Sequence, residues 1–425
     1  MCGGLTVQIA ICGGERADGD VSIQGSKNAA LPMLAASILT EDEMVFHRCP
    51  QIYDVEWMLA LLRHLGVKAT WEADTLRVQA NHLQSHDILQ KEAGRIRASI
   101  LFLGSLLART GSAKVHMPGG CSIGKRPIDI HMDALEKSGI QVSDREEWLV
   151  CESGSKPETV EIHFPYPSVG ATENLILYHV LGKGKARLKN TAREPEINSL
   201  CEMLRQMGAK ISGEKTGNIY IEGVKKLHGI HTKIPADRIA FMTYAAMALG
   251  TQGKICLRTG GESFEPEQRY LEKAGCHFVA GTNEIIAEGT RGICPISFLK
   301  TQPYPGFPTD AQSIFLSLLS RAHGESVLCE TVFENRFQMI PYLKKMGADI
   351  ERMEQCAHIR GVTRLHGETV VATDLRSGAA LLLAGAMAEG KTCVEKAENI
   401  LRGYVEPVEQ MKKMGLRVQW EEEES

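Results

Sequence analysis

Six short phrases recur along the chain: LGVKAT at 65–70, SGIQVS at 138–143, MGAKIS at 207–212, AGCHFV at 274–279, MGADIE at 346–351 and MGLRVQ at 414–419. Their glycines are spaced 73, 69, 67, 72 and 68 residues apart. A spacing this regular indicates an internal repeat of about 70 residues. Six such repeats account for nearly all of the 425 residues.

Every repeat predicts the same order of elements. An Ala/Leu-rich stretch such as 28–39 predicts a helix, and a β-branched stretch such as 112–117 predicts a strand. A second predicted helix, 55–66, ends in Gly66, because glycine readily adopts the left-handed conformation that closes a helix. Two strands, 67–72 and 75–80, complete the repeat. The predicted class is α/β: six βαβαββ units in two domains of three, each burying one sheet face under two helices.

The composition is that of a globular protein. Hydrophobic residues make up 43% and charged residues 24%, and the formal net charge is −4. A protein that coats nucleic acid is usually basic, and the aromatic–basic pattern of an RNA-binding surface is missing, so no nucleic-acid partner is expected.

The cysteines and the apolar runs bear on the cellular compartment. Twelve cysteines are spread along the chain without a CxxC pair, which disfavours a structural zinc site and predicts free thiols in a reducing cytoplasm. The first twenty residues lack the features of a signal peptide. The longest apolar run, 378–388, is too short to span a bilayer. We therefore expect a cytoplasmic protein without membrane insertion.

The first helix of each repeat opens beside polar or charged residues. The openings are Ser26-Lys27-Asn28, Arg95-Ile96-Arg97, Ser168-Val169-Gly170, Asp237-Arg238, Thr309-Asp310 and Asp374-Leu375-Arg376. Carboxylates are ordinary caps at this position, but the helix dipole opposes cations there. The four cations at equivalent positions, Lys27, Arg97, Arg238 and Arg376, could pair with nearby acids or face solvent. Their recurrence at equivalent positions favours a shared anionic ligand.

The stretch PGGCSIGKRPIDIH, residues 118–131, predicts a loop because three glycines and two prolines fall within ten residues. It carries Cys121 with Lys125 and Arg126 close by. Cationic neighbours favour the reactive thiolate, which makes Cys121 a candidate nucleophile or proton donor. The alternative is a cysteine that merely falls in a flexible loop.

Nine motifs occur in order along the chain and together resemble one family. They are GSKNAALP (25–32), RASILFLG (97–104), PGGCSIGKRPIDIH (118–131), PSVGATEN (167–174), AREPEI (192–197), PGFPTD (305–310), ETVFENRF (330–337), DLRSGAALLLAG (374–385) and RGY (402–404). This set is similar to the UDP-N-acetylglucosamine 1-carboxyvinyltransferases, a family of enolpyruvyl transferases.

The resemblance implies an inside-out α/β barrel of two domains whose active-site cleft closes on substrate. Residues 27–234 would form the domain that carries the Cys121 loop, and residues 1–26 and 235–425 would form the other. The implied reaction transfers the enolpyruvyl group of phosphoenolpyruvate to the 3′-hydroxyl of UDP-N-acetylglucosamine and releases phosphate by addition and elimination. This is the first committed step of peptidoglycan synthesis, on which cell-wall biogenesis, cell shape and division depend.

The family's properties also imply which partners to expect. No cofactor and no metal take part, and the enzyme is a monomer or a weak homo-oligomer. The family is the target of fosfomycin, an epoxide that mimics phosphoenolpyruvate.

The resemblance also implies site residues. Phosphoenolpyruvate would be bound by Lys27, Arg126 and Arg402. Cys121 would donate the proton, and Asp310 would act as base for the sugar hydroxyl. The expected catalytic residues are Lys27, Cys121, Asp310 and Arg402. Further contacts to the sugar nucleotide would come from Asn28, Arg97, Pro127, Ile128, Asp129, Ile130, Tyr166, Ser168, Val169, Gly170 and Val332. Arg336, Asp374 and Arg376 would line and close the cleft.

The chain departs from the family pattern near its C-terminus, where Leu401 replaces the usual acid beside Arg402. This leaves a second interpretation open, a diverged paralogue that binds sugar nucleotide without turnover. A third, the enolpyruvyl transferase that acts on shikimate 3-phosphate, would not normally carry the PGGC loop or PSVGAT.

Overall fold

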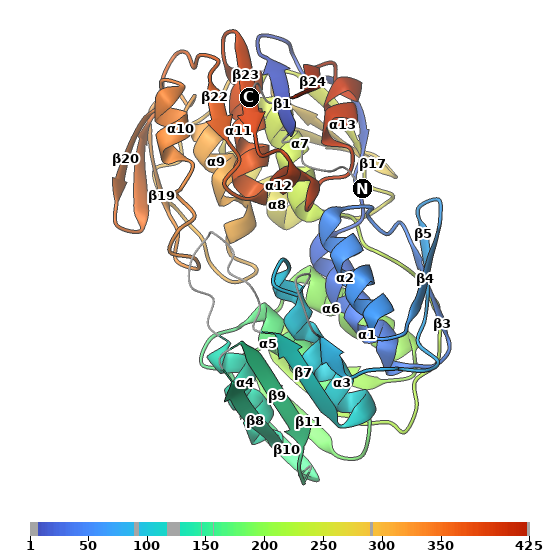
Figure 1. Ribbon diagram of the computed structural model, residues 1–425. Helices are drawn as coiled ribbons and strands as arrows, with labels where there is room; N and C mark the ends of the chain where they lie inside the picture. The colour runs from blue at the N-terminus through green and yellow to red at the C-terminus, as the bar shows by residue number, and fades with distance from the viewer. Residues whose placement is uncertain are drawn as a thin grey trace. The chain divides into compact units, whose positions relative to one another are not determined.

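The computed structural model describes residues 7–88, 93–116, 128–145, 147–155, 157–289 and 292–422. The chain divides into two compact units (Figure 1). The central unit comprises the described residues from Gly25 to Pro235, and the terminal unit comprises those of Met1–Gln24 and Ala236–Ser425.

The described residues of each unit form three four-stranded sheets. In the central unit the strand orders are β14-β3-β5-β4, β6-β7-β9-β8 and β10-β11-β13-β12. These strands are β3 (Glu43–His47), β4 (Lys68–Glu72), β5 (Thr75–Gln79), β6 (Asp87–Ile88), β7 (Ser112–His116), β8 (Ile140–Arg145), β9 (Trp148–Ser153), β10 (Thr159–His163), β11 (Lys185–Lys189), β12 (Lys210–Ser212), β13 (Asn218–Glu222) and β14 (His231–Lys233).

In the terminal unit the orders are β16-β17-β15-β2, β18-β19-β21-β20 and β22-β23-β1-β24. These strands are β1 (Val7–Cys12), β2 (Asp18–Ser22), β15 (Lys254–Arg258), β16 (His277–Ala280), β17 (Glu284–Glu288), β18 (Leu299–Lys300), β19 (Glu325–Cys329), β20 (Asp349–Met353), β21 (Cys356–Arg360), β22 (Thr369–Val371), β23 (Lys391–Glu395) and β24 (Arg417–Glu422).

Three of the six sheets borrow a strand from a distant part of the chain. Strand β14 pairs in parallel with β3, and β2 pairs in parallel with β15. Strand β1 pairs antiparallel with both β23 and β24, so the blue strand lies among red ones in Figure 1. The six predicted βαβαββ units are therefore present, but three of them are completed by strands from outside their own stretch of sequence.

The first helix of each repeat is buried. In the central unit these are α1 (Lys27–Ala36), α3 (Phe102–Thr110) and α5 (Val169–His179); in the terminal unit they are α7 (Arg238–Gly250), α9 (Gln312–Leu319) and α11 (Leu375–Met387). Most residues of these helices are small or aliphatic and buried, so the helices can pack on each other: α3 contacts α1 and α5, and α11 contacts α7 and α9. Sheets and amphipathic helices surround each bundle (Figure 1).

The second helix of each repeat lies nearer the surface. These helices are α2 (Tyr53–His64), α4 (Asp129–Lys137), α6 (Pro195–Gln206), α8 (Glu265–Lys273), α10 (Ile340–Lys345) and α13 (Pro407–Lys413). All six are followed by the repeated glycine, with φ between 79° and 105°. The predicted left-handed helix ends are thus confirmed. No helix among the described residues is long and apolar enough to cross a membrane.

Candidate active site

The predicted helix openings are helix starts in the structure. Lys27, Val169, Arg238 and Leu375 are the first residues of α1, α5, α7 and α11, while Arg97 and Thr309 open the short 3₁₀ helices η2 (Arg97–Leu101) and η4 (Thr309–Ala311). The residues before the four α-helices cap them: the side chains of Ser26, Ser168, Asp237 and Asp374 accept hydrogen bonds from backbone N–H groups of the first turn. The sequence pattern is therefore explained in part by ordinary capping.

Asp310 forms the centre of an ion-pair cluster in the terminal unit. Arg336 Nη2 donates to Asp310 Oδ1 at 2.6 Å, and Arg376 Nη2 donates to Asp310 Oδ2 at 2.8 Å. Both arginine side chains are 4% exposed, whereas the Asp310 side chain is 22% exposed. Three predicted site residues thus come together, and the carboxylate keeps an accessible edge.

The surroundings of Arg376 are strongly polar. Burial would lower the pKa of its guanidinium, but Asp310, Tyr404 and Asp237 together raise that pKa above its ordinary value. Tyr404 is buried, and its hydroxyl lies 2.7 Å from the Thr243 hydroxyl. Burial raises the pKa of Tyr404, although Arg376 and Thr243 oppose the shift. At the start of α11, the positively charged guanidinium of Arg376 therefore lies close to the neutral hydroxyl of Tyr404.

Acids pair with Lys27, Arg238 and Arg376, three cations that open helices. Lys27 forms an ion pair with Asp54, at the start of α2, and Arg238 Nη1 lies 3.5 Å from Glu267 Oε1. Arg376 pairs with Asp310. The interpretation as internal ion pairs, which the sequence left open, holds for these three. Lys27 keeps 14% of its side chain exposed, more than Arg238 with 10% or Arg376 with 4%.

The segment Ser168–Gly170 is packed against a buried polar network in the central unit. The Asn174 amide nitrogen lies 2.9 Å from His131 Nδ1 and donates to Ile100 O at 3.1 Å. A Cβ on Gly170 would lie only 3.1 Å from His131 Cε1, so glycine lets α5 begin directly against this ring. Tyr166, two residues before Ser168, is 40% exposed.

The loop that contains Val332 is fixed by a residue that the sequence analysis did not single out. Glu330, 2% exposed, accepts hydrogen bonds from the backbone N–H groups of Val332 at 2.7 Å and Phe333 at 3.1 Å. It also accepts from the hydroxyls of Thr301 and Thr309. Sequence spacing alone gives no signal for this site, because Thr301 and Thr309 lie 29 and 21 residues away.

Arg402 follows the short helix α12 (Glu398–Leu401) and is half-buried. The loop after it is held by Gln24, which donates to Gly403 O and accepts from Val405 N, each at 2.8 Å. Leu401, at the position where the family resemblance implies an acid, is half-buried. Gln24 was not identified from the sequence.

Several predicted residues are not brought into this geometry. Cys121, Arg126 and Pro127 lie outside the described residues. Ile128 precedes α4, and Asp129 and Ile130 are its first two residues. No group of three or more potential metal ligands occurs among the residues that the structure describes.

The prediction that the cysteines are free thiols is wrong for two of them. Cys329 and Cys356 face each other at the end of the β19–β21 ladder and form a disulfide. Antiparallel neighbours in this register bring their Cα atoms to 4.0 Å, a contact that spacing along the chain does not reveal.

Burial raises the pKa of the free thiols Cys151, Cys201 and Cys276 to about 12.

Glu173, on α5, is a buried acidic residue. Burial, with Glu196 and Glu194 nearby, raises the pKa of Glu173 well above its ordinary value. Ionisation of this carboxyl is therefore less favourable in the folded protein than in the unfolded chain.

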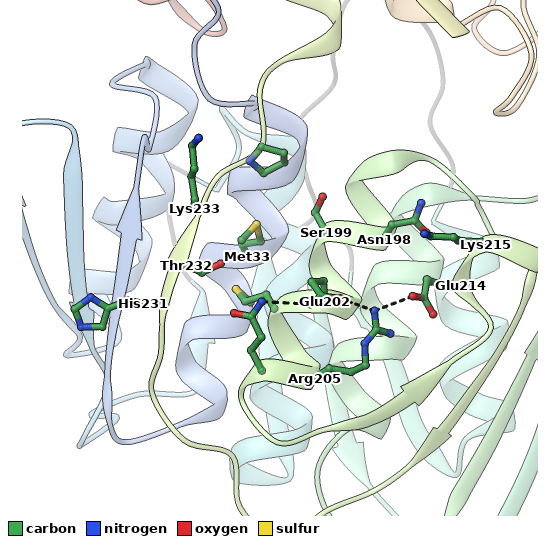
Figure 2. Close-up of a pocket in the computed structure, with 13 residues that line it drawn as sticks. Met33, Asn198, Ser199, Glu202, Arg205, Glu214, Lys215, His231, Thr232 and Lys233 are labelled. Carbon is green, nitrogen blue, oxygen red and sulfur yellow. Dashed lines mark hydrogen bonds and ion pairs between the residues drawn. The ribbon is translucent and has the colours of Figure 1, made fainter. Parts of the chain in front are cut away.

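A pocket of about 550 Å³ lies in the central unit beside α6 (Figure 2). Arg205 reaches across it and pairs with Glu202 and Glu214, each at 2.9 Å. None of the predicted site residues lines this pocket. The chemistry predicted from the sequence does not coincide with it.

Comparison with known proteins identifies the family. The family described as EPSP synthase (3-phosphoshikimate 1-carboxyvinyltransferase) matches residues 11–411. A UDP-N-acetylglucosamine 1-carboxyvinyltransferase 2 of Caldanaerobacter subterraneus is 41% identical over 95% of this chain and 97% of its own length. The UDP-N-acetylglucosamine 1-carboxyvinyltransferase of Endomicrobium trichonymphae is 40% identical over 96% of this chain and 98% of its own length. The chain belongs to the UDP-N-acetylglucosamine 1-carboxyvinyltransferase family.

Solved structures support the fold of this family member. The enolpyruvyl transferase NikO of Streptomyces tendae aligns with a TM-score of 0.88 at 22% identity, covering 99% of this chain and all of its own. An EPSP synthase of Acinetobacter baumannii aligns with a TM-score of 0.75 at 19% identity, covering 98% of this chain and all of its own. The predicted inside-out α/β fold is confirmed.

Proposed function

We propose that this protein transfers the enolpyruvyl group of phosphoenolpyruvate to the 3′-hydroxyl of UDP-N-acetylglucosamine and releases phosphate. The observation that carries the proposal is the match at 41% identity, over nearly the full length of both chains, to a relative named for this activity. The ion-paired carboxylate of Asp310, at the start of a buried helix, supports it. We propose that the reaction takes place in the cytoplasm, the compartment that the sequence features predict.

Each charged site residue has a role that its surroundings support. Lys27, oriented by Asp54 and still partly exposed, would bind an anionic group of phosphoenolpyruvate. Arg402 would bind the same substrate, with its loop steadied by Gln24. Asp310 would accept a hydrogen bond from the sugar hydroxyl, because two buried arginines fix its carboxylate while one edge stays accessible.

The chemistry needs a proton donor for the alkene and cations for the leaving phosphate. We propose Cys121 as the donor and Arg126 as a further cation, on the strength of the sequence motif. Contacts to the sugar nucleotide would come from Asn28, Arg97, Ser168, Val169, Val332 and the residues 127–130.

Phosphate release with UDP-N-acetylglucosamine and phosphoenolpyruvate tests the activity. We expect turnover with this pair and none when shikimate 3-phosphate replaces the sugar nucleotide. Turnover with shikimate 3-phosphate would assign the chain to the other branch of its family. Binding of the sugar nucleotide without phosphate release would support the non-catalytic interpretation.

One substitution tests the role of Asp310. Asp310→Asn keeps the shape of the side chain and removes its charge, so kcat should fall by roughly 10² or more. The dissociation constant for UDP-N-acetylglucosamine, measured by calorimetry, should change much less. Near-normal turnover would exclude Asp310 from the chemistry.

A further inference from the structure

The buried carboxylate of Glu330 has no part in the roles proposed above, yet it is among the most fully bonded side chains of the terminal unit. Its oxygen Oε1 accepts from the Thr301 hydroxyl at 2.9 Å and from the backbone N–H groups of Val332 and Phe333 at 2.7 and 3.1 Å. The other oxygen, Oε2, accepts from the Thr309 hydroxyl at 2.7 Å. All four of these donors are neutral. With 2% of the residue exposed, the carboxylate depends on them for its solvation.

The position of Glu330 is fixed from its own side of the chain as well. It directly follows β19, and its N–H donates to Gln355 O at 2.8 Å, which extends the pairing with β21. The Cys329–Cys356 disulfide closes the same end of the ladder. Glu330 is therefore an anchor attached to the sheet rather than a side chain on a free loop.

Three of its four donors, Thr309, Val332 and Phe333, lie on two segments that carry proposed site residues. Thr309 and Asp310 are consecutive in η4, and Val332 is itself an expected contact of the sugar nucleotide. A single rigid group thus bonds the segment that presents the carboxylate of Asp310 and the segment that presents Val332. We propose that Glu330 is a positioning residue, which sets the place of Asp310 relative to the sugar nucleotide through Thr309 and Val332. This inference rests on the proposed transferase function.

The variant Thr309→Val cuts the connection to Asp310 while keeping the side-chain shape and the bonds to Val332. A displacement of about 1 Å in a reacting group can lower a rate by as much as 10². We expect kcat for phosphate release to fall about tenfold or more while the KM for UDP-N-acetylglucosamine stays within about twofold. Thr392→Val is the matched control: Thr392 is a fully buried threonine of the same unit whose hydroxyl lacks a hydrogen-bond partner within the described structure. It should leave kcat unchanged.

Glu330→Gln and Glu330→Met separate positioning from a need for charge. Glutamine can still accept from Val332, and the Thr309 hydroxyl can rotate to accept from its amide, whereas methionine can do neither. We expect Met to lower kcat/KM about 10² or more, and Gln to recover most of that loss. If Thr309→Val retains kcat within twofold of the wild type, or Gln is as impaired as Met, the positioning role is wrong.

Hydrogen–deuterium exchange tests the inference even if the proposed function fails. In Glu330→Met, amides of both segments, 309–311 and 332–333, should exchange at least tenfold faster, with β15 of the same unit unchanged. Unchanged exchange in either segment would overturn the inference, whereas absence of turnover in the wild-type protein would overturn only the proposed function.

Discussion

Asp310→Asn should destabilise the terminal unit, apart from any effect on turnover. The substitution removes the negative charge of Asp310, with which the Arg336 and Arg376 guanidiniums pair at 2.6 and 2.8 Å. Each arginine side chain is 4% exposed, so water cannot solvate the charge that the lost carboxylate leaves unpaired. Removing one partner of a buried pair costs about 3–5 kcal/mol. Asp310 is 22% exposed and asparagine keeps one acceptor oxygen, so we expect the lower end, about 3 kcal/mol.

For a unit of this size the loss corresponds to a decrease in melting temperature of about 6–12 °C. Differential scanning calorimetry at pH 7.5 measures it. Tryptophan fluorescence assigns the transition, because Trp57, Trp71 and Trp148 lie in the central unit and Trp420 in the terminal one. The fluorescence of the first three reports whether the central unit keeps its own stability.

The matched control is Asp349→Asn. Asp349 also pairs with an arginine, at 3.2 Å, but its side chain is 52% exposed, so the change should cost under about 0.5 kcal/mol. The double variant Asp310→Asn/Arg376→Met should recover part of the loss, because it removes one of the two uncompensated cations. If Asp310→Asn lowers the melting temperature no more than Asp349→Asn does, the ion-pair argument is wrong.

Three further outcomes are expected. Glu173→Gln should raise the melting temperature at pH 7.5, because the raised pKa of Glu173 makes its ionisation less favourable in the folded protein than in the unfolded chain, which ionises it above its ordinary pKa of 4.5; the gain should vanish below about pH 4.5, and an equal gain at both pH values would contradict the argument. The folded pKa of Cys201, about 12, exceeds the ordinary value of 9.0, so stability should be lost as pH rises above 9; Cys201→Ala should flatten the dependence of melting temperature on pH between 9 and 11, and an unaltered slope would count against it. Fosfomycin should alkylate Cys121 and spare Cys201 and Cys276 at pH 7.5, which peptide mapping after labelling checks; label on the buried thiols would refute the selectivity.

Local chemistry made much of the fold predictable. Gly66 and its five counterparts end helices for a reason that a few neighbouring residues decide, and their spacing gave the number of repeats. The caps Ser26 and Asp374 are predictable in the same way, because their partners lie within one helical turn.

The unpredicted features depend on contacts between distant residues. The pairing of β1 with β23 spans almost the entire chain, and no local pattern specifies it. The same holds for the Cys329–Cys356 disulfide, which the ladder register creates. Asp54 and Glu330, which orient Lys27 and the Asp310 segment, look like ordinary surface acids in the sequence and become recognisable only through their burial.

The borrowed strand β1 has a consequence for synthesis on the ribosome. Val7–Cys12 is made first, yet its partner Lys391–Glu395 follows nearly 380 residues later. At about 5–20 residues per second, this apolar segment waits on the order of 20–75 s with its edges unpaired. The central unit, whose residues lie between Gly25 and Pro235, has all its described strands by Lys233 and can fold during that time. The nascent chain therefore keeps the apolar segment Val7–Cys12 unpaired after the central unit has folded, and this is the interval in which we expect a chaperone to bind the segment.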